Sequence, residues 1–203
     1  MRTLAKWMQL NYPFRNQIYR ARQARALRKW DGKGPAPHPV KQGNIKKYAL
    51  KHGIRTLVET GTYYGDMIEA LRECFDQIYS IEVSDPLFRK AKRRFRGYPN
   101  IEIMLGDSAV LLGELVPTLR EPALFWLDGH YSGGVTGKGD RDTPVFEELG
   151  HIFASPQRHI VLIDDARCFG EDPDYPSAKE LVEFIQSQRD ADVRVEEDSF
   201  IVE

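Results

Sequence analysis

The stretch TLVETGTYYGDMIEALRECFDQIYSIEVS, residues 56–84, contains a strand pattern, a helix pattern and a second strand pattern. Residues 56–61 and 77–83 have the β-branched and apolar composition of buried strands. Between them, a turn with two glycines leads into residues 66–75, where apolar side chains recur at helical spacing. A strand followed by a helix and another strand is typical of two parallel strands joined by a helical crossover.

The same alternation continues to the C-terminus. The apolar runs ALFWL and HIVLI are typical of central strands buried on both faces of a parallel sheet. Two short strand patterns close the chain, and their tight connection predicts an antiparallel pair. We therefore predict an α/β fold with a Rossmann-like, doubly wound, mostly parallel sheet and helices on both faces. Further strands are expected at 101–107, 123–129, 159–166, 193–198 and 199–203, and helices at 86–95, 108–119, 143–153 and 177–188.

The N-terminal part differs from the rest of the chain. Residues 1–30 have a helical pattern with a break expected near Pro13. The next stretch, DGKGPAPHPVKQG at 31–43, is rich in proline and glycine, which is typical of a linker. We therefore predict a basic helical extension with its linker at 1–43 and one α/β domain at 44–203.

Charge is distributed unevenly along the chain, although the formal net charge is only −1. Residues 1–50 carry 12 Lys and Arg and one acid, a net of +11. Residues 51–203 carry 17 Lys and Arg and 29 acids, a net of −12. Three interpretations of the basic segment are open: an arm that docks on the acidic domain, a helix that lies on an anionic membrane surface, and a segment that binds nucleic acid.

The sequence also bears on the cellular compartment. No apolar run reaches the roughly 18–20 residues of a membrane span, and the N-terminus lacks the apolar core of a signal peptide. The two cysteines, Cys74 and Cys168, match no zinc or redox spacing and are interpreted as reduced thiols. We therefore expect a cytoplasmic protein, with peripheral membrane contact if the basic helix lies on a membrane.

The turn after the first strand, VETGTYYG, is the first candidate binding element. Gly61 and Gly65 would let the backbone approach a ligand closely, and the following helix offers free N–H groups at its N-terminus. The dinucleotide pattern G-x-G-x-x-G is not met, because Tyr63 stands where its middle glycine would be. An ordinary strand-to-helix turn is the alternative.

Polar residues also end the next two strands. Glu82 lies about 20 residues beyond the glycines, where an acid commonly binds ribose hydroxyls, although it could instead cap a turn or lie on the surface. Asp107, just before Ser108, could accept a hydrogen bond from an exocyclic amine such as that of adenine, or it could cap the next helix. The two roles of Asp107 can coexist.

Three carboxylates end the fourth and fifth strands: Asp128 in ALFWLDG, and Asp164 and Asp165 in HIVLIDDA. Clustered acids repel one another unless a cation lies between them, and oxygen ligands favour Mg²⁺, Mn²⁺ or Ca²⁺ over zinc. His130 follows Asp128 by two residues, where a neutral imidazole would be a good general base near pH 7. The alternative is that Asp165 caps a loop and His130 is structural.

The order VETGTYYG, SIEVS, LGDS, WLDGHYSGG and LIDDA is similar to that of class I S-adenosylmethionine-dependent methyltransferases, from about residue 44 to the C-terminus. The closing antiparallel strand pair also fits that fold. The resemblance implies S-adenosyl-L-methionine as the cofactor, with the glycine turn beside its methionine part, Glu82 at the ribose and Asp107 with Ser108 at the adenine. The cofactor-binding residues that it implies are Glu59, Gly61, Tyr63, Gly65, Glu82, Asp107 and Ser108.

The D-G-x-Y and D-D elements more narrowly resemble the metal-dependent sugar O-methyltransferases of antibiotic biosynthesis, the macrocin O-methyltransferase type. The resemblance implies that Asp128, Asp164 and Asp165 hold Mg²⁺. The base of that family lies two residues past the first ligand, commonly in a D-G-D pattern, and this chain has His130 there. The implied acceptor is a hydroxyl of a sugar or glycosylated small molecule. Tyr131 and the glycine-rich loop after it would form a lid.

Other functions stay open. An NAD-dependent oxidoreductase would share the fold, but Tyr63 in the glycine turn and the aspartate cluster argue against it. A metal-dependent hydrolase would use the three acids but leave the glycine turn unexplained. A non-catalytic binding module would have no need of the intact acid set. The basic segment also suggests an RNA methyltransferase, but the absence of an N-P-P-Y motif argues against N-methylation of bases. We do not expect a nucleic acid partner.

Overall fold

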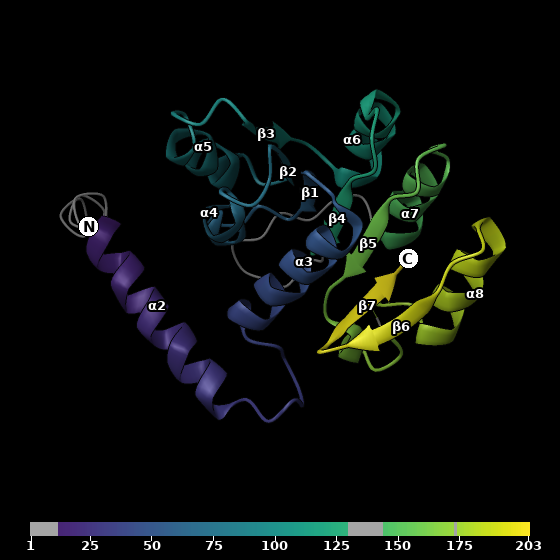
Figure 1. Ribbon diagram of the computed structural model, residues 1–203, viewed down its shortest axis with the longest axis horizontal. Helices are drawn as coiled ribbons and strands as arrows, with labels where there is room; N and C mark the ends of the chain where they lie inside the picture. Colours follow the sequence, from purple (N-terminus) through teal and green to yellow (C-terminus); the bar gives the residue numbers. More distant parts are fainter. Residues whose placement is uncertain (1–11, 130–143, 173) are drawn as a thin grey trace.

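The computed structural model describes residues 12–129, 144–172 and 174–203 (Figure 1). Its centre is a seven-stranded sheet with the strand order β3-β2-β1-β4-β5-β7-β6. The first five strands run parallel, and β7 pairs antiparallel with both β5 and β6. The strands are β1 (Thr56–Thr60), β2 (Gln77–Glu82), β3 (Ile101–Leu105), β4 (Leu124–Leu127), β5 (Ile160–Ile163), β6 (Val193–Glu196) and β7 (Ser199–Val202).

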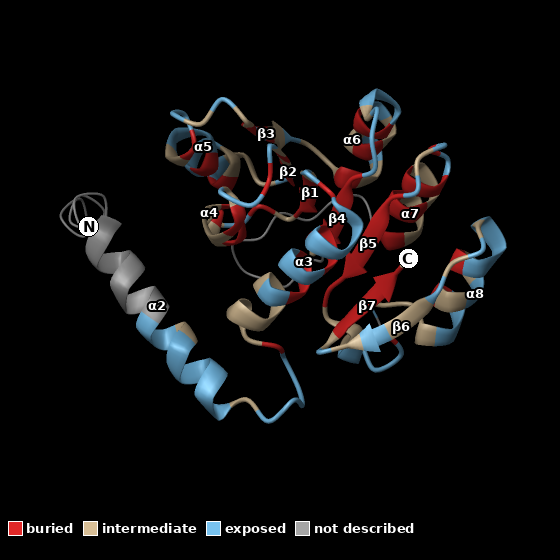
Figure 2. Cartoon of the chain, viewed as in Figure 1, coloured by how far each residue is buried: buried red, intermediate tan, exposed pale blue. Residues whose placement is uncertain are grey.

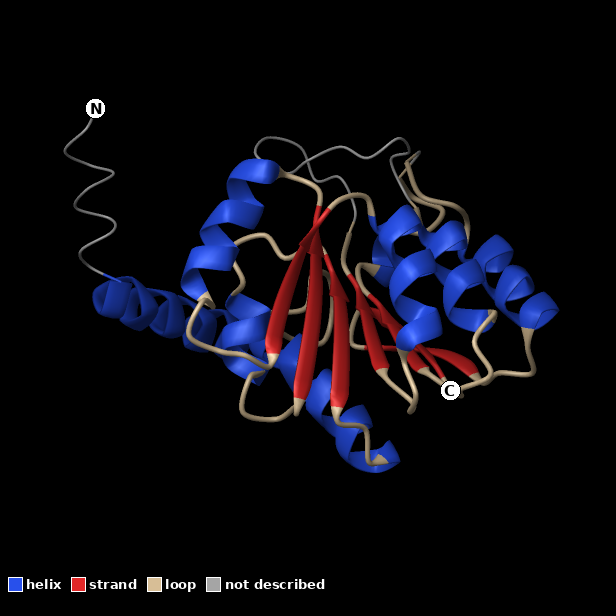
Figure 3. Cartoon of the chain, turned by 90° about the horizontal axis from the view of Figure 1, so that it is seen from above, coloured by secondary structure: helices blue, strands red, loops and turns tan. Residues whose placement is uncertain are grey.

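Helices cover both faces of this sheet (Figure 3). Side chains of α3, α4 and α5 belong to the apolar cluster on one face, and side chains of α6, α7 and α8 belong to the cluster on the other. The predicted Rossmann-like, doubly wound arrangement is therefore confirmed. The helices are α2 (Tyr12–Lys29), α3 (His38–His52), α4 (Asp66–Leu71), α5 (Asp85–Arg94), α6 (Ser108–Leu115), α7 (Val145–Phe153) and α8 (Ala178–Gln188), with 3₁₀ turns at Val116–Thr118 and Ala166–Cys168.

The central strand β4 shows why an unbroken apolar run forms a strand here. Leu124 and Trp126 pack in the cluster under α3 to α5, whereas Phe125 and Leu127 pack in the cluster under α6 to α8. All four side chains are fully buried, and each contributes roughly 1.5–3 kcal/mol on burial. Figure 2 shows the same complete burial along β5 and β7. Both faces of the sheet centre therefore require apolar residues.

The C-terminal strand pair is the predicted antiparallel hairpin. Glu197 and Asp198 form its two-residue turn, and both have positive φ, 48° and 70°. Such a turn matches the twist of the strands, although Asn-Gly is the usual sequence. The Asp198 carboxylate accepts hydrogen bonds from the N–H groups of Ala36 (3.3 Å) and Arg167 (3.1 Å). The hairpin is thereby tied to the segments before α3 and after β5.

The N-terminal part differs from the prediction in its linker. Pro13 lies in the first turn of α2, where N–H groups have no partner within the helix, and residues 1–11 lie outside the described ranges, so the predicted break near Pro13 stays a prediction. α3 begins at His38, so residues 38–43 of the predicted linker are helical. Pro39 is accommodated in that first turn for the same reason. The predicted boundary at residue 43 therefore falls inside a helix.

Two predicted helices also end early. α4 stops at Leu71, before the predicted end at residue 75. The helix predicted at 108–119 ends at Leu115 and continues as a 3₁₀ turn that contains Pro117. Proline has no N–H to donate to the preceding turn, so the α-helical ladder cannot pass through it.

The basic helix α2 lies apart from the sheet and contacts α3 (Figure 1). Its charged side chains at Arg22, Arg25, Arg28 and Lys29 are exposed. Among the helices that the structure describes, none has the length and apolarity needed to cross a membrane.

Candidate cofactor and metal site

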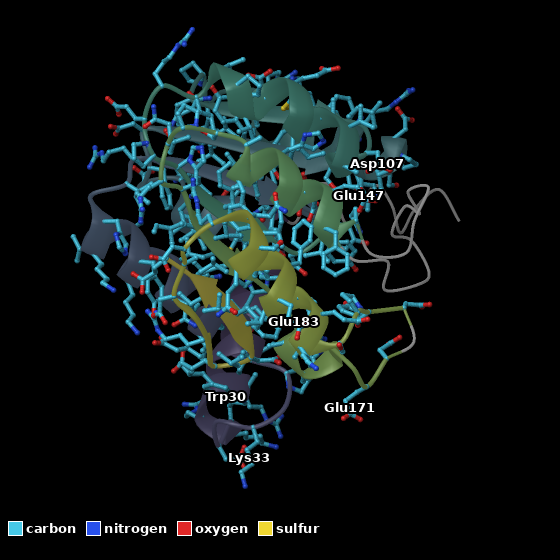
Figure 4. The ribbon with its side chains drawn as sticks, turned by 90° about the vertical axis from the view of Figure 1, so that its right-hand side faces the viewer. Trp30, Lys33, Asp107, Glu147, Glu171 and Glu183 are labelled. Carbon is cyan, nitrogen blue, oxygen red and sulfur yellow. The ribbon has the colours of Figure 1, made fainter. Side chains whose placement is uncertain are left out.

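The carboxyl ends of β1 and β4 form the switch point of the sheet, because the strand order runs outward from them in opposite directions. Ligands of open α/β sheets bind in the crevice outside such ends. The predicted site residues within the described ranges all lie at or just after the ends of β1 to β5. Figure 4 shows Asp107, at the start of α6, and Glu147, at the start of α7, at one edge of the molecule.

Gly61 and Gly65 are required by the geometry of the turn after β1. Gly61 has φ 86°, and a Cβ there would lie 2.4 Å from the carbonyl oxygen of Asp128. Gly65 has φ 74°, and a Cβ there would lie 2.6 Å from Cε2 of Phe95. L-residues rarely adopt such φ values. The turn therefore presents bare backbone between the end of β4 and the end of α5.

Glu82 connects β2 to this turn through main-chain hydrogen bonds. Its Oε2 accepts from the Tyr63 N–H (2.7 Å), and its Oε1 accepts from the Ser84 N–H (2.9 Å). Burial raises the pKa of Glu82, and the two N–H groups act in the opposite direction. The turn-capping alternative for Glu82 is therefore observed, and ribose binding stays a prediction.

Tyr63 has a left-handed backbone conformation with φ 50°, and its side chain is exposed. A non-glycine residue in this region costs on the order of 1–2 kcal/mol. Arg94 supports the turn, because its Nη1 donates to the Tyr64 carbonyl oxygen (2.5 Å) and to Asp66 Oδ1 (2.7 Å). Backbone strain of this kind clusters at ligand-binding sites, which is compatible with a binding role for the turn.

Glu59 lies beneath the turn, in β1. The Ser80 hydroxyl, opposite it on β2, donates to Glu59 Oε2, and Ser80 also forms a hydrogen bond with Thr62 (2.6 Å). Burial raises the pKa of Glu59 to about 8, so most of this carboxyl group is protonated at neutral pH. Glu59 thus braces β1 against β2, and its contact with a cofactor stays a prediction.

Asp107 caps α6, since its Oδ1 accepts a hydrogen bond from the Ala109 N–H (2.9 Å). The next residue, Ser108, is buried and forms a hydrogen bond with Glu148 of α7. Burial raises the pKa of Glu148 to about 7. Sequence reasoning misses Glu148, although its place beside Leu149 on the apolar face of a helix is a usable signal.

The three predicted metal ligands come together. One carboxylate oxygen from each of Asp128, Asp164 and Asp165 lies within 4.8 Å of the other two. Asp164 is fully buried, and its Oδ1 has no hydrogen-bond partner in the described part of the chain. A set of hard oxygen donors with an unpaired buried carboxylate oxygen fits a divalent cation such as Mg²⁺, Mn²⁺ or Ca²⁺.

Burial and proximity perturb these acids. Burial raises the pKa of Asp164 to about 6. Burial, and then the neighbouring Asp164, raise the pKa of Asp128 well above its usual range. Asp165 has a left-handed backbone with φ 56° and accepts a hydrogen bond from Arg167 Nη1 (2.8 Å). The raised pKa values indicate that three ionised carboxylates here require compensating positive charge.

Lys41 of α3 supplies part of that charge. Its Nζ donates to Asp164 Oδ2 and lies 3.5 Å from Oδ1 of Asp165. Burial lowers the pKa of Lys41, but the carboxylates of Asp164 and Asp128 outweigh this effect, and the net shift is upward. The sequence holds no local signal for this contact, because Lys41 lies 123 residues before Asp164 in a segment with linker composition.

A histidine lies near Lys41 at the start of α3. His38 begins α3, and its Nδ1 is 3.0 Å from Nε2 of Gln42. Burial, and then the charge of Lys41, lower the pKa of His38, which keeps the imidazole neutral near pH 7. The predicted base, His130, and the predicted lid with Tyr131 lie outside the described residues, so both stay predictions.

No protein-family model matches the sequence, and no curated protein sequence matches it. The structure is similar to several solved methyltransferases. The SAH-bound Podospora anserina methyltransferase PaMTH1 aligns with a TM-score of 0.57 and 14% identity, over 91% of this chain and 86% of that one. The O-methyltransferase from Bacillus cereus in complex with SAH aligns with a TM-score of 0.56 and 15% identity, over 92% and 88%.

N-methyltransferase NodS from Bradyrhizobium japonicum WM9 has the same fold as well, with a TM-score of 0.54 and 12% identity, over 81% of this chain and 93% of that one. The chain therefore has the Rossmann-like methyltransferase fold. The similar structures include both N- and O-methyltransferases. Fold alone thus leaves the acceptor to be argued from the site.

Proposed function

We propose that the chain is an S-adenosylmethionine-dependent methyltransferase that methylates a hydroxyl of a sugar or glycosylated small molecule with divalent-metal assistance. One observation carries the proposal: Gly61 packs against the carbonyl oxygen of Asp128. The glycine turn and the first acid of the cluster are therefore adjacent at the switch point of the sheet. A methyl donor on the turn and an acceptor at the acids would meet there.

In this proposal, the backbone at Gly61 and Gly65 borders the methionine part of S-adenosyl-L-methionine. The absence of Cβ atoms there is what a close backbone approach requires. Glu82 contacts the ribose with its carboxylate, while Asp107 and Ser108 contact the adenine. Asp107 also caps α6 by accepting the Ala109 N–H with its Oδ1, and in this proposal the same side chain serves both roles.

The remaining two cofactor residues, Glu59 and Tyr63, flank the glycine turn. Glu59 supports the turn through its hydrogen bond with Ser80. Tyr63 contributes an exposed ring beside the cofactor. A tyrosine in place of the middle glycine would crowd the pyrophosphate of NAD, but S-adenosyl-L-methionine has no pyrophosphate. This difference favours the methyltransferase over the oxidoreductase.

The reaction is a displacement at the methyl carbon. The acceptor oxygen forms a bond to that carbon as the carbon–sulfonium bond breaks, which leaves S-adenosylhomocysteine and a methyl ether. His130 takes the hydroxyl proton as the general base. Asp128, Asp164 and Asp165 would hold the metal, which when bound lowers the pKa of a coordinated hydroxyl and orients it. The protein contributes alignment of the acceptor with the methyl group.

Product analysis tests this function. The chain is incubated with S-adenosyl-L-methionine and a panel of sugars and glycosylated small molecules, with Mg²⁺ or with a chelator, and methyl ethers are detected by mass spectrometry. We expect a product that requires Mg²⁺ and is lost in the Asp164→Ala/Asp165→Ala variant. Methylation of RNA alone, or of nitrogen alone, would contradict the proposed acceptor.

We also propose that α2 contacts an anionic membrane surface from the cytoplasmic side, where a lipid-linked glycan could be the acceptor. The exposed side chains of Arg22, Arg25, Arg28 and Lys29 support this contact. The same charge would attract RNA, which is therefore the competing partner to be tested.

A further inference from the structure

Lys41 contacts two members of the acid cluster defined by Asp128, Asp164 and Asp165. Its Nζ donates to Asp164 Oδ2 and lies 3.5 Å from Asp165 Oδ1. Only 14% of the Lys41 side chain and none of the Asp164 side chain is exposed. The contact is thus a buried ion pair between a helix on one face of the sheet and the end of its fifth strand.

The charges of this cluster are not balanced by Lys41 alone. Three carboxylates carry up to three negative charges, and Lys41 returns one. Arg167 pairs with Asp165, but it also pairs with Asp198, so its charge is shared with an acid outside the cluster. A divalent cation would neutralise more of this negative charge than the single ammonium group of Lys41 does.

The ammonium and a metal ion nevertheless compete for the same carboxylate. A hard divalent cation takes its oxygen ligands at about 2.0–2.6 Å. An ion held by Asp164 together with the other two acids would therefore lie beside the oxygen that now accepts from Lys41. Two positive charges at such separation in a buried site repel one another strongly. Lys41 must move away for the ion to bind.

We propose that Lys41 is a tethered cation that partly neutralises the acid cluster and is displaced when a divalent metal binds. Lys41 is in this sense a positioning residue: it holds the ligands together and sets the affinity of the site for the ion. The inference rests on the proposed metal site and adds a competitor that belongs to the chain itself. The first turn of α3 then changes its contacts with metal occupancy.

Calorimetric titration with MgCl₂ and MnCl₂ tests this competition. The full chain is compared with its Lys41→Met variant and with Lys47→Met as the matched control. Lys47 lies on the same helix and pairs with Glu196 at the surface (2.6 Å), away from the cluster. We expect Lys41→Met to bind the ion at least about tenfold more tightly than the unmodified chain, within the range of site-to-site couplings. Lys47→Met should leave the affinity unchanged.

A second measurement needs no variant and covers the case in which Lys41→Met does not fold. Lysine acetylation with a water-soluble reagent is followed by mass spectrometry, with and without Mg²⁺. We expect the reactivity of Lys41 to increase severalfold when the ion is present, while that of Lys47 stays constant. Unchanged protection of Lys41 at saturating ion would overturn the proposal.

The outcomes separate this inference from the proposed function. Equal or weaker metal binding by folded Lys41→Met would overturn the competition. Failure of both forms to bind either ion would overturn it too and would contradict the divalent-metal assistance, while S-adenosylhomocysteine binding in the same samples would keep S-adenosyl-L-methionine as the cofactor. Tighter metal binding by the variant without any binding of S-adenosylhomocysteine would support the tethered cation and contradict the proposed function.

Discussion

Replacement of Gly61 by alanine should distort both the glycine turn proposed to bind the cofactor and the backbone of Asp128 in the proposed metal site. The new Cβ would lie 2.4 Å from the Asp128 carbonyl oxygen and 2.9 Å from its carbonyl carbon. These are backbone atoms, so no side-chain rotation relieves the contact. The φ of 86° adds the cost of a left-handed residue, about 1–2 kcal/mol. Overpacking adds about 1–3 kcal/mol, so the free energy of unfolding should fall by roughly 2–5 kcal/mol.

Gly53→Ala is the matched control. Gly53 ends α3 with φ 64°, but a Cβ there has no atom within 4 Å. It therefore reports the backbone cost alone, about 1–2 kcal/mol. For a chain of this size each kcal/mol lowers Tm by about 2–4 °C, so thermal unfolding should separate the two variants.

The functional result is equally specific. Displacement of the Gly61 turn and the Asp128 backbone should weaken the binding of both S-adenosylhomocysteine and Mg²⁺ in Gly61→Ala, as measured by calorimetry below its Tm. Gly53→Ala should bind both normally. Equal stability and equal binding in the two variants would refute the close packing of the turn against β4.

Three further changes probe other parts of the account. The folded-state pKa of Glu59 is raised from 4.5 to about 8, so its contribution to the free energy of unfolding is full below about pH 4.5 and is lost as the pH rises toward 8. In urea unfolding at a series of pH values, Glu59→Gln should make the free energy of unfolding decline less over this range. An unchanged decline would contradict a buried, neutral Glu59. His130→Ala should lower kcat by about 10²–10⁴ while the Kd for S-adenosylhomocysteine changes little; loss of cofactor binding in the folded variant would refute its role as the base. Removal of residues 1–30, which takes away α2 and leaves α3 intact, should abolish sedimentation with anionic vesicles at moderate salt. Equal sedimentation of both forms, or retention of RNA alone by the full chain, would exclude the membrane contact.

The sheet is predictable because its signals are local. Each apolar run contains enough consecutive side chains to bury both faces, as Phe125 and Trp126 do in β4. The acid cluster is predictable for a topological reason, since parallel strands bring their carboxyl ends to one edge. Asp128 and Asp164 end neighbouring strands, and the register of β4 with β5 then places them together.

Other features depend on contacts that no local pattern encodes. Lys41 reaches Asp164 across 123 residues, and only the packing of α3 on the sheet creates that pair. The same region shows how composition misleads, because Pro39 is typical of a linker and is equally compatible with a first helical turn. The sequence also could not decide whether Asp107 and Glu82 bind a ligand or cap the backbone, because that depends on hydrogen bonds formed in the fold. Both side chains accept hydrogen bonds from main-chain N–H groups.

The central claim is that this switch point binds S-adenosyl-L-methionine. Calorimetric titration of the full chain with S-adenosylhomocysteine and, separately, with NADH, each with and without Mg²⁺, tests it most directly. We predict saturable binding of S-adenosylhomocysteine and no binding of NADH. Binding of NADH, or of neither ligand, would contradict the claim and favour the oxidoreductase in the first case and a metal-dependent hydrolase or binding module in the second.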